Sequence, residues 1–129
     1  MAHASAAPRI TGVGTVGIPV TDQGRALAFY GGTLGFETRL DAEFGPGLRW
    51  IEVAPAGAAT SVALLPVTPD VPVGVDTHIR LSTDDAAADH AALAAAGVEV
   101  GEFLSEPVPM FWFHDPDGNT LYLVQRPGE

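Results

Sequence analysis

The alternation of apolar and polar residues predicts a set of short strands in the first half of the chain. Across residues 13–20, Val16, Ile18 and Val20 are apolar and alternate with small or polar residues, which is typical of a half-buried strand. Pro19 lacks an amide hydrogen, so this strand is expected to lie at the edge of a sheet or to be locally irregular there. The same half contains three more extended segments: residues 36–40, 48–54 and 60–65.

A helix is predicted between the first two of these strands. Thr21 and Asp22 supply an N-cap. They precede an apolar stripe at helical spacing, which consists of Ala26, Leu27, Phe29 and Tyr30. Gly31 and Gly32 weaken the end of the helix, and Gly35 supplies a turn. The first half therefore follows the order strand, helix, strand, strand, strand.

The second half repeats this order. A strand is predicted over residues 77–82, and the helix after it begins at Asp84-Asp85 and ends at Gly97. Extended segments follow at residues 98–100, 110–114 and 120–126, the last two flanking the turn Asp115-Pro116-Asp117-Gly118-Asn119. Asp22, Gly35 and Glu37 recur as Asp84, Gly97 and Glu99 at a constant spacing of 62. An internal duplication is favoured over an α+β sandwich without internal symmetry.

A single α+β domain is predicted over residues 1–129. It consists of a first module, residues 12–65, and a second module, residues 76–126. The connector between them, residues 66–75, contains prolines whose missing amide donors exclude a helix or a central strand: Pro66, Pro69 and Pro72.

Composition narrows the classes of function. The chain has no cysteine, which excludes a disulfide scaffold and thiolate-bound metals. Its formal charge of −10 at pH 7 argues against nucleic acid and against an anionic membrane surface as partners. The N-terminal residues lack the basic and continuous apolar regions of a signal peptide, and no apolar run is long enough to span a bilayer. We therefore expect a cytoplasmic protein.

The alternation also separates two faces of the predicted sheets. One face is apolar and is expected to pack under the helices: Val16, Ile18, Ile51, Val53, Val62, Leu64, Ile79, Leu81, Phe111, Phe113, Leu121 and Leu123. The opposite face mixes aromatic, small and polar residues: Thr15, Gly17, Trp50, Glu52, Ser61, Ala63, His78, Arg80, Met110, Trp112, His114 and Tyr122. Wide aromatic surfaces with a few polar groups suit a flat organic ligand.

Several segments resemble one known family. Val20-Thr21-Asp22, residues 25–30 and Leu34-Gly35-Phe36 are similar to the first strand and helix of the vicinal-oxygen-chelate superfamily, and residues 113–121 to its final hairpin. That superfamily includes glyoxalase I, extradiol dioxygenases and bleomycin-resistance proteins. The resemblance covers residues 12–126 and implies two tandem βαβββ modules whose curved sheets surround a cavity.

In enzymes of that superfamily, side chains from four strands bind a divalent metal in the cavity. The resemblance assigns those positions here to Thr15 (Val16 if the repeat spacing is used), Ala63, His78 and Tyr122. Only His78 is an ordinary metal ligand, whereas about three nitrogen or oxygen ligands are needed. We therefore expect no metal, no cofactor and no catalytic residue. The alternative is that Glu52 or His114 rebuilds a site together with His78.

The resemblance and the aromatic face together predict a small-molecule-binding protein of the bleomycin-resistance type, which sequesters an aromatic natural product or antibiotic. The expected ligand-binding residues are Trp50, Glu52, His78, Arg80, Met110, Trp112, His114 and Tyr122. One alternative is a glyoxalase- or dioxygenase-like enzyme that uses a rebuilt metal site or a His78/Glu52 acid–base pair. The other is a structural subunit without a ligand.

Individual residues have plainer interpretations as well. Either tryptophan can fill the core or a subunit contact. Arg80 and Glu52 can form a buried ion pair, and Tyr122 can fill the space of a lost metal. His90, on the second predicted helix, is expected to be solvated.

A C2 homodimer is expected, because half-barrels of this superfamily often complete each other across a two-fold axis. Its two pockets would be lined by both subunits. Residues 101–109 are expected to form a loop near a pocket or near the interface.

Overall fold

The computed structural model describes residues 7–126, so residues 1–6 and 127–129 of the predicted domain lie outside the described range. The first module contains β1 (Thr15–Val20), α1 (Gln23–Leu27), the π-helical turn η1 (Ala28–Thr33), β2 (Glu37–Glu43), β3 (Arg49–Ala54) and β4 (Ser61–Pro66). The second contains β5 (Asp76–Ser82), α2 (Ala86–Ala95), β6 (Met110–His114) and β7 (Thr120–Val124). The α+β fold class is confirmed.

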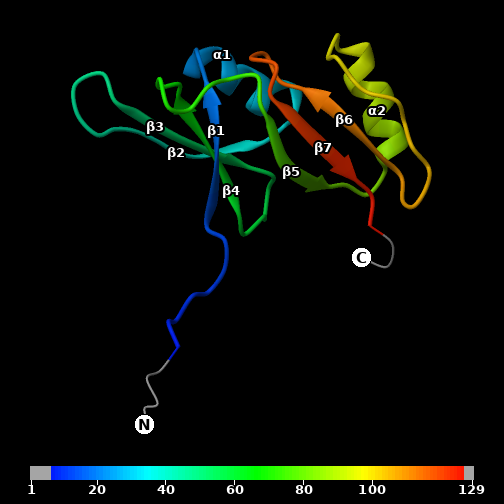
Figure 1. Ribbon diagram of the computed structural model, residues 1–129, viewed down its shortest axis with the longest axis horizontal. Helices are drawn as coiled ribbons and strands as arrows, with labels where there is room; N and C mark the ends of the chain where they lie inside the picture. Colours follow the sequence, from blue (N-terminus) through cyan, green and yellow to red (C-terminus); the bar gives the residue numbers. More distant parts are fainter. Residues whose placement is uncertain (1–6, 127–129) are drawn as a thin grey trace.

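The strands form two separate sheets, and both helices lie on the same side of them (Figure 1). The first sheet has the order β1-β4-β3-β2, with β1 parallel to β4. The second has the order β5-β7-β6, with β5 parallel to β7. The predicted edge position of the strand that contains Pro19 is confirmed, because β1 ends the first sheet.

The second sheet has one strand fewer than the repeated βαβββ order predicts. The expected extended segment 98–100 makes only an isolated bridge, between Val100 and Phe113. Beyond Gly101, whose amide donates to the carbonyl of Trp112, the pairing with β6 is interrupted at residues 102–103 and resumes in a second isolated bridge, between Leu104 and Met110. Two single bridges do not make a continuous strand, so this segment is not part of the second sheet.

The predicted apolar face is the core of the protein. The hydrophobic core and its half-buried margin contain all of the residues assigned to the helix side: Val16, Ile18, Ile51, Val53, Val62, Leu64, Ile79, Leu81, Phe111, Phe113, Leu121 and Leu123. Because successive side chains of a strand point to opposite faces, this result fixes the residues between them on the other face.

The two helices begin with an aspartate cap and are each followed by a glycine turn. Asp22 caps α1 through a hydrogen bond of 3.0 Å from the amide of Arg25. Asp85 rather than Asp84 caps α2, through the amide of Ala88 at 3.0 Å. The expected weakening at Gly31 and Gly32 does not end the first helix, which widens into η1 and continues to Thr33. The turn glycines Gly35 and Gly97 both adopt the left-handed conformation, with φ of 78° and 85°.

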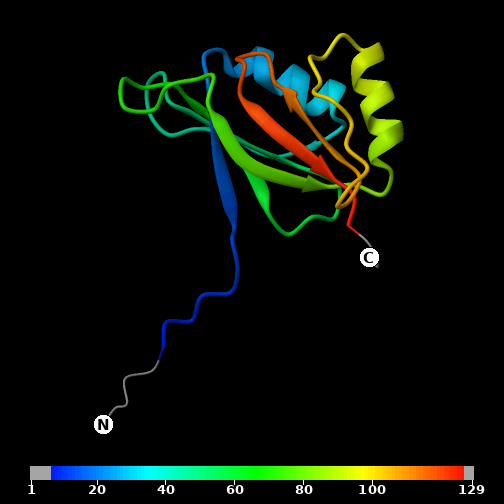
Figure 2. The same cartoon turned by 45° about the vertical axis from the view of Figure 1, so that its right-hand side comes forward.

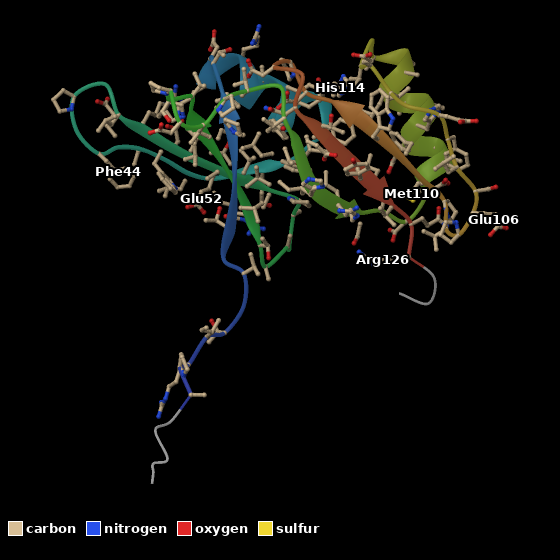
Figure 3. The ribbon with its side chains drawn as sticks, viewed as in Figure 1. Phe44, Glu52, Glu106, Met110, His114 and Arg126 are labelled. Carbon is tan, nitrogen blue, oxygen red and sulfur yellow. The ribbon has the colours of Figure 1, made fainter. Side chains whose placement is uncertain are left out.

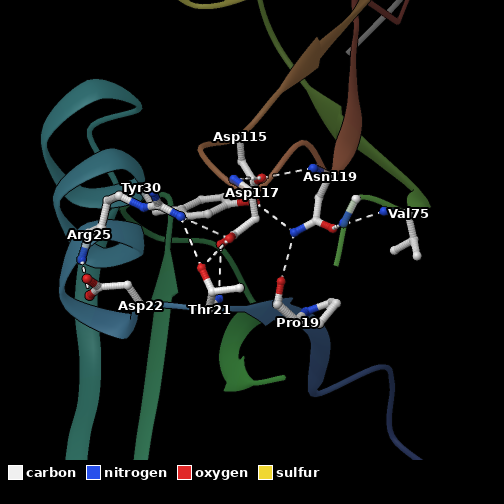
Figure 4. A network of polar contacts seen from close by, with 10 residues as sticks. Pro19, Thr21, Asp22, Arg25, Tyr30, Val75, Asp115, Asp117 and Asn119 are labelled. Carbon is white, nitrogen blue, oxygen red and sulfur yellow. Dashed lines mark hydrogen bonds and ion pairs between the residues drawn. The ribbon is translucent and has the colours of Figure 1, made fainter. Parts of the chain in front are cut away.

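The turn between β6 and β7 fastens the second module to the first (Figure 4). Asp115 accepts a hydrogen bond of 2.9 Å from the hydroxyl of Tyr30, a residue of η1. Asn119 donates to the carbonyl of Pro19 on β1 at 2.8 Å. Asp117 pairs with Arg25 at 2.9 Å. The turn residues predicted from local geometry therefore also connect the two modules.

The pKa of Tyr30 reflects this environment. Burial, and then the neighbouring carboxylate of Asp115, raise the pKa of the Tyr30 hydroxyl far above its ordinary value. Tyr30 therefore stays protonated and acts as a hydrogen-bond donor to Asp115.

The chain before β1 leaves the first sheet: the carbonyls of Val13 and Gly14 still accept hydrogen bonds from Thr60 and Ser61, whereas residues 7–12 run away from both sheets (Figures 1 and 2). Within residues 7–126, no helix has the length and apolarity needed to cross a membrane.

Removing the Asn119 side chain should strongly destabilise the protein. Asn119 is fully buried, and its amide oxygen also accepts bonds from the backbone amides of Gly74 and Val75. Asn119→Ala would leave several buried polar groups without partners, so we expect the free energy of unfolding to fall by about 3 kcal/mol. Urea denaturation measures this change. Asp70→Ala, in the exposed connector, serves as the control, and an Asn119→Ala midpoint equal to that of the control would contradict the account.

Candidate ligand-binding faces

Trp50, Glu52 and Ser61 form a hydrogen-bonded group, the Trp50 cluster, on the face of the first sheet away from the helices. Trp50 and Glu52 are two residues apart on β3 and therefore share a face. The indole Nε1 of Trp50 donates to one carboxylate oxygen of Glu52 at 2.7 Å. The hydroxyl of Ser61, on β4, donates to the other oxygen at 2.6 Å. These two bonds fix the orientation of the indole ring.

The same bonds keep Glu52 ionised. The hydrogen bond from Ser61 and then the one from Trp50 lower the pKa of the Glu52 carboxyl below its ordinary value. Glu52 therefore carries a negative charge at neutral pH.

Small residues border the Trp50 cluster. Glu52 faces Ala63 across the sheet, and Ala63 faces Gly17 on β1. A Cβ at Gly17 would lie 2.8 Å from the Cδ1 atom of Leu65, so Leu65 covers this part of the strand.

Tyr122 is at the centre of an aromatic group on the second sheet. Its neighbours across the ladders are Trp112 on β6 and Arg80 on β5. The guanidinium carbon of Arg80 lies 5.0 Å from the centre of the Tyr122 ring, which is within cation–π distance. The hydroxyl of Tyr122 donates to Asp76 at 2.7 Å, which lowers the pKa of Asp76 and raises the pKa of Tyr122.

Trp112 extends this group along β6. Its ring centre lies 4.6 Å from that of His114, and the two planes are inclined by 31°. The Nδ1 atom of His114 lies 2.8 Å from a carboxylate oxygen of Glu99. Met110, at the start of β6, exchanges two backbone hydrogen bonds of 2.9 Å with Leu104. We call Arg80, Tyr122, Trp112 and His114 the Trp112 cluster.

His78 belongs to neither cluster. It has φ of 59°, in the left-handed region, at the point where the β5–β7 ladder is interrupted between Asp76 and Arg80. Its side chain is 75% exposed. The alternation predicted for residues 77–82 is kept, because His78 and Arg80 are exposed whereas Ile79 and Leu81 are half-buried against the core. A bulge at His78 interrupts only the pairing of β5 with β7.

Two of the plainer interpretations are wrong. Arg80 and Glu52 do not pair, since Glu52 binds Trp50 and Ser61 on one sheet whereas Arg80 lies over Tyr122 on the other. His90 is half-buried rather than solvated, and its Nε2 atom lies 2.8 Å from the carbonyl oxygen of Gly101.

Three residues of the site were not identified from the sequence. Glu99 appeared only as a marker of the repeat, although it orients His114. Asp76 precedes the predicted strand, and Gly101 appeared only as the start of a loop. No local pattern marks them, because their contacts depend on which strands become neighbours.

The strand order keeps the two clusters apart within one chain. Trp50 is on β3 and Trp112 is on β6, with β4 and β1 intervening in the first sheet and β7 and β5 in the second. Adjacent strands of one sheet are about 4.8 Å apart, so each tryptophan is separated from the first strand of the other module by more than one strand width. Figure 3 labels Phe44 and Glu52 on the side of the first sheet, and Met110 and His114 on the side of the second.

The helix side contains an apolar cavity of about 290 Å³ between the two modules. Leu34 and Phe36 line it from the first module, and Leu81, Leu93 and Leu123 line it from the second. It lies on the opposite side of the sheets from the two clusters.

The residues at the metal positions of the resembled family do not fit a divalent ion. Ala63 has no donor atom, Thr15 donates its hydroxyl to the carbonyl of Ser61, and Tyr122 donates its hydroxyl to Asp76. His78 is an ordinary ligand type, but it stands on the bulge. Within residues 7–126, no three His, Asp or Glu side chains are grouped so that they could hold a metal.

Known proteins resemble this chain in sequence and in fold. The model of the Glyoxalase/Bleomycin resistance protein/Dioxygenase superfamily matches residues 12–123. TnmS3, an antibiotic binding protein from Streptomyces sp. CB03234, is 38% identical with a TM-score of 0.83, over 92% of this chain and 98% of that one. A member of the same superfamily from Sphaerobacter thermophilus DSM 20745 is 36% identical with a TM-score of 0.83, over 91% and 98%. YetH of Bacillus subtilis (strain 168) is 33% identical, over 88% and 97%.

Removing the Glu52 carboxylate should release the indole of Trp50. With Trp112 replaced by Phe, Trp50 is the remaining tryptophan. Adding Glu52→Ala to this protein should shift the Trp50 emission to longer wavelength and increase its quenching by acrylamide. Ser61→Ala should have a smaller effect, because the indole of Trp50 keeps the Glu52 carboxylate as its acceptor. In the protein that keeps Glu52, the emission should stay constant as the pH falls through the ordinary titration range of a glutamate and should change only below it, because the hydrogen bonds from Ser61 and Trp50 lower the pKa of Glu52. Equal quenching with and without Glu52 would refute the role of this bond.

Proposed function

Because the chain belongs to the Glyoxalase/Bleomycin resistance protein/Dioxygenase superfamily, we propose that it binds an aromatic small molecule in the manner of a bleomycin-resistance protein. Sequestration of an aromatic natural product or antibiotic would keep that molecule from its target. The observation that carries the proposal is the position of Trp50, Trp112 and Tyr122. All three are half-buried on sheet faces that are separate from the hydrophobic core.

The chemistry of the two clusters supports a flat aromatic ligand. Large, rigid rings offer stacking surfaces at low entropic cost, and aromatic pairs gain about 0.5–1.5 kcal/mol beyond their buried area. The carboxylate of Glu52 adds a fixed negative charge beside Trp50, which favours a ligand with a cationic group. TnmS3, described as an antibiotic binding protein, supports the same class of ligand through its 38% identity over nearly the whole chain.

A homodimer is part of the proposal, because one chain separates its two aromatic clusters by several strands. A second copy related by a two-fold axis would bring the Trp50 cluster of one subunit against the Trp112 cluster of its partner, and would do so twice. Exposed apolar side chains in the loops next to the two tryptophan-bearing strands support an interface: Phe44 (62% exposed) and Leu48 (58%) between β2 and β3, and Leu104 (43%) before β6.

A ligand titration tests the binding proposal. The probes are doxorubicin, a planar aromatic antibiotic with an amine, and riboflavin, a neutral flavin, and tryptophan fluorescence and thermal shift are the signals. We expect micromolar binding of at least one probe. Trp50→Ala and Trp112→Ala should each weaken it by at least about tenfold, as for central aromatic residues of a binding site. Asp70→Ala, in the exposed connector, should leave it unchanged.

The binding proposal is refuted if neither probe binds, or if both tryptophan variants bind as tightly as the unaltered protein. Weaker binding of riboflavin than of doxorubicin, reversed by Glu52→Gln, would support the preference for a cation.

Sedimentation equilibrium tests the dimer. We expect twice the mass of the chain at micromolar concentration, and a shift towards the monomer in Leu48→Asp, because a charge at this exposed apolar position would be desolvated at the interface. A monomer at all concentrations would contradict the shared pockets.

A further inference from the structure

Gly101 lies directly against the indole of Trp112. A Cβ at Gly101 would stand 2.2 Å from Nε1 and 2.3 Å from Cε2 of Trp112. Ordinary contacts between such atoms are longer than about 3.4 Å, so only a glycine leaves room for the ring in this position. The amide of Gly101 also donates to the carbonyl of Trp112 at 2.8 Å.

His90 holds the same glycine from the helix α2. Its Nε2 atom lies 2.8 Å from the carbonyl oxygen of Gly101. The His90 ring is itself fixed by the core, because it meets Phe111 edge-on with ring centres 4.8 Å apart, and it also contacts Phe103 at 5.9 Å. The position of the Gly101 backbone is thus tied to the core through one side chain.

We propose that Gly101 and His90 are positioning residues that hold the Trp112 indole as a wall of the ligand site. His90 sets the position of the segment that contains Gly101, and the missing side chain of Gly101 lets the indole lie against that segment. The indole then stacks against His114 at 4.6 Å. This inference rests on the proposed function for its consequence in binding, whereas the contacts themselves are tested without a ligand.

A double-mutant cycle tests the contact between Gly101 and Trp112. Gly101→Ala should lower the melting temperature in the unaltered protein, because the new methyl group collides with the indole. In Trp112→Ala, where the ring is absent, Gly101→Ala should have less than half of that effect. Gly32→Ala is the matched control, since a Cβ at Gly32 meets nothing within 4 Å.

The result that overturns the contact is an equal loss of melting temperature from Gly101→Ala in both backgrounds. If Gly101→Ala alone fails to fold, recovery of a folded protein in the Gly101→Ala/Trp112→Ala double variant supports the proposal, and no recovery refutes it.

Fluorescence of Trp112 tests the role of His90. With Trp50 replaced by Phe, His90→Ala should increase acrylamide quenching of Trp112, and His90→Gln, whose amide can still donate to Gly101, should restore most of the protection. Equal quenching in all three proteins would refute the proposal.

Binding of doxorubicin completes the test and separates this inference from the proposed function. Gly101→Ala and His90→Ala should weaken binding by at least about fivefold, while Gly32→Ala should not. Absence of doxorubicin and riboflavin binding in the unaltered protein counts against the proposed function, while the melting and fluorescence results still decide the positioning role. Unchanged doxorubicin affinity in both variants would refute the positioning role.

Discussion

The carboxylate of Asp115 is buried between the two modules, and their relative arrangement depends on it. A buried charge is costly unless donors surround it. Asp115 accepts four hydrogen bonds: from the Tyr30 hydroxyl, from the Asn119 side chain, and from the backbone amides of Asp117 and Asn119. Tyr30 belongs to the first module, so these bonds are complete only when the second module is docked against it.

The docked arrangement of the two modules determines which strand residues face the core and which face the opposite side. With both helices on one side of the sheets, the apolar residues of every strand pack in the core, and the residues between them are directed to the other side. That side carries the Trp50 cluster and the Trp112 cluster. The strand order places them on different sheets, which is why the proposed site involves two subunits.

Much of the fold could be predicted from local patterns. The period-two alternation of strands identified the core face, because one side of each sheet must be buried whatever the partner. Asp22 could be identified as a helix cap, and Gly35 and Gly97 as turns, because each role depends on a few neighbouring atoms. The missing strand at residues 98–100 could not be predicted, since pairing there depends on where residues 101–109 travel.

Less of the candidate site could be predicted from local patterns in the sequence. Composition and alternation placed both tryptophans on the same kind of surface, but the bond between Trp50 and Glu52 depends on rotamers. The bulge at His78 interrupts the pairing of β5 with β7, which the residue types alone do not predict. The contact between His90 and Gly101 joins a helix to a loop, so no spacing in the sequence reveals it.

Subunit complementation tests the central claim most directly, namely that each pocket combines Trp50 of one subunit with Trp112 of its partner. Trp50→Ala and Trp112→Ala proteins, each with weakened binding, are mixed, unfolded and refolded together so that mixed dimers form, and doxorubicin binding is titrated. Shared pockets predict that one of the two sites in each mixed dimer regains the affinity of the unaltered protein. A mixture that binds no better than its two components would contradict the claim.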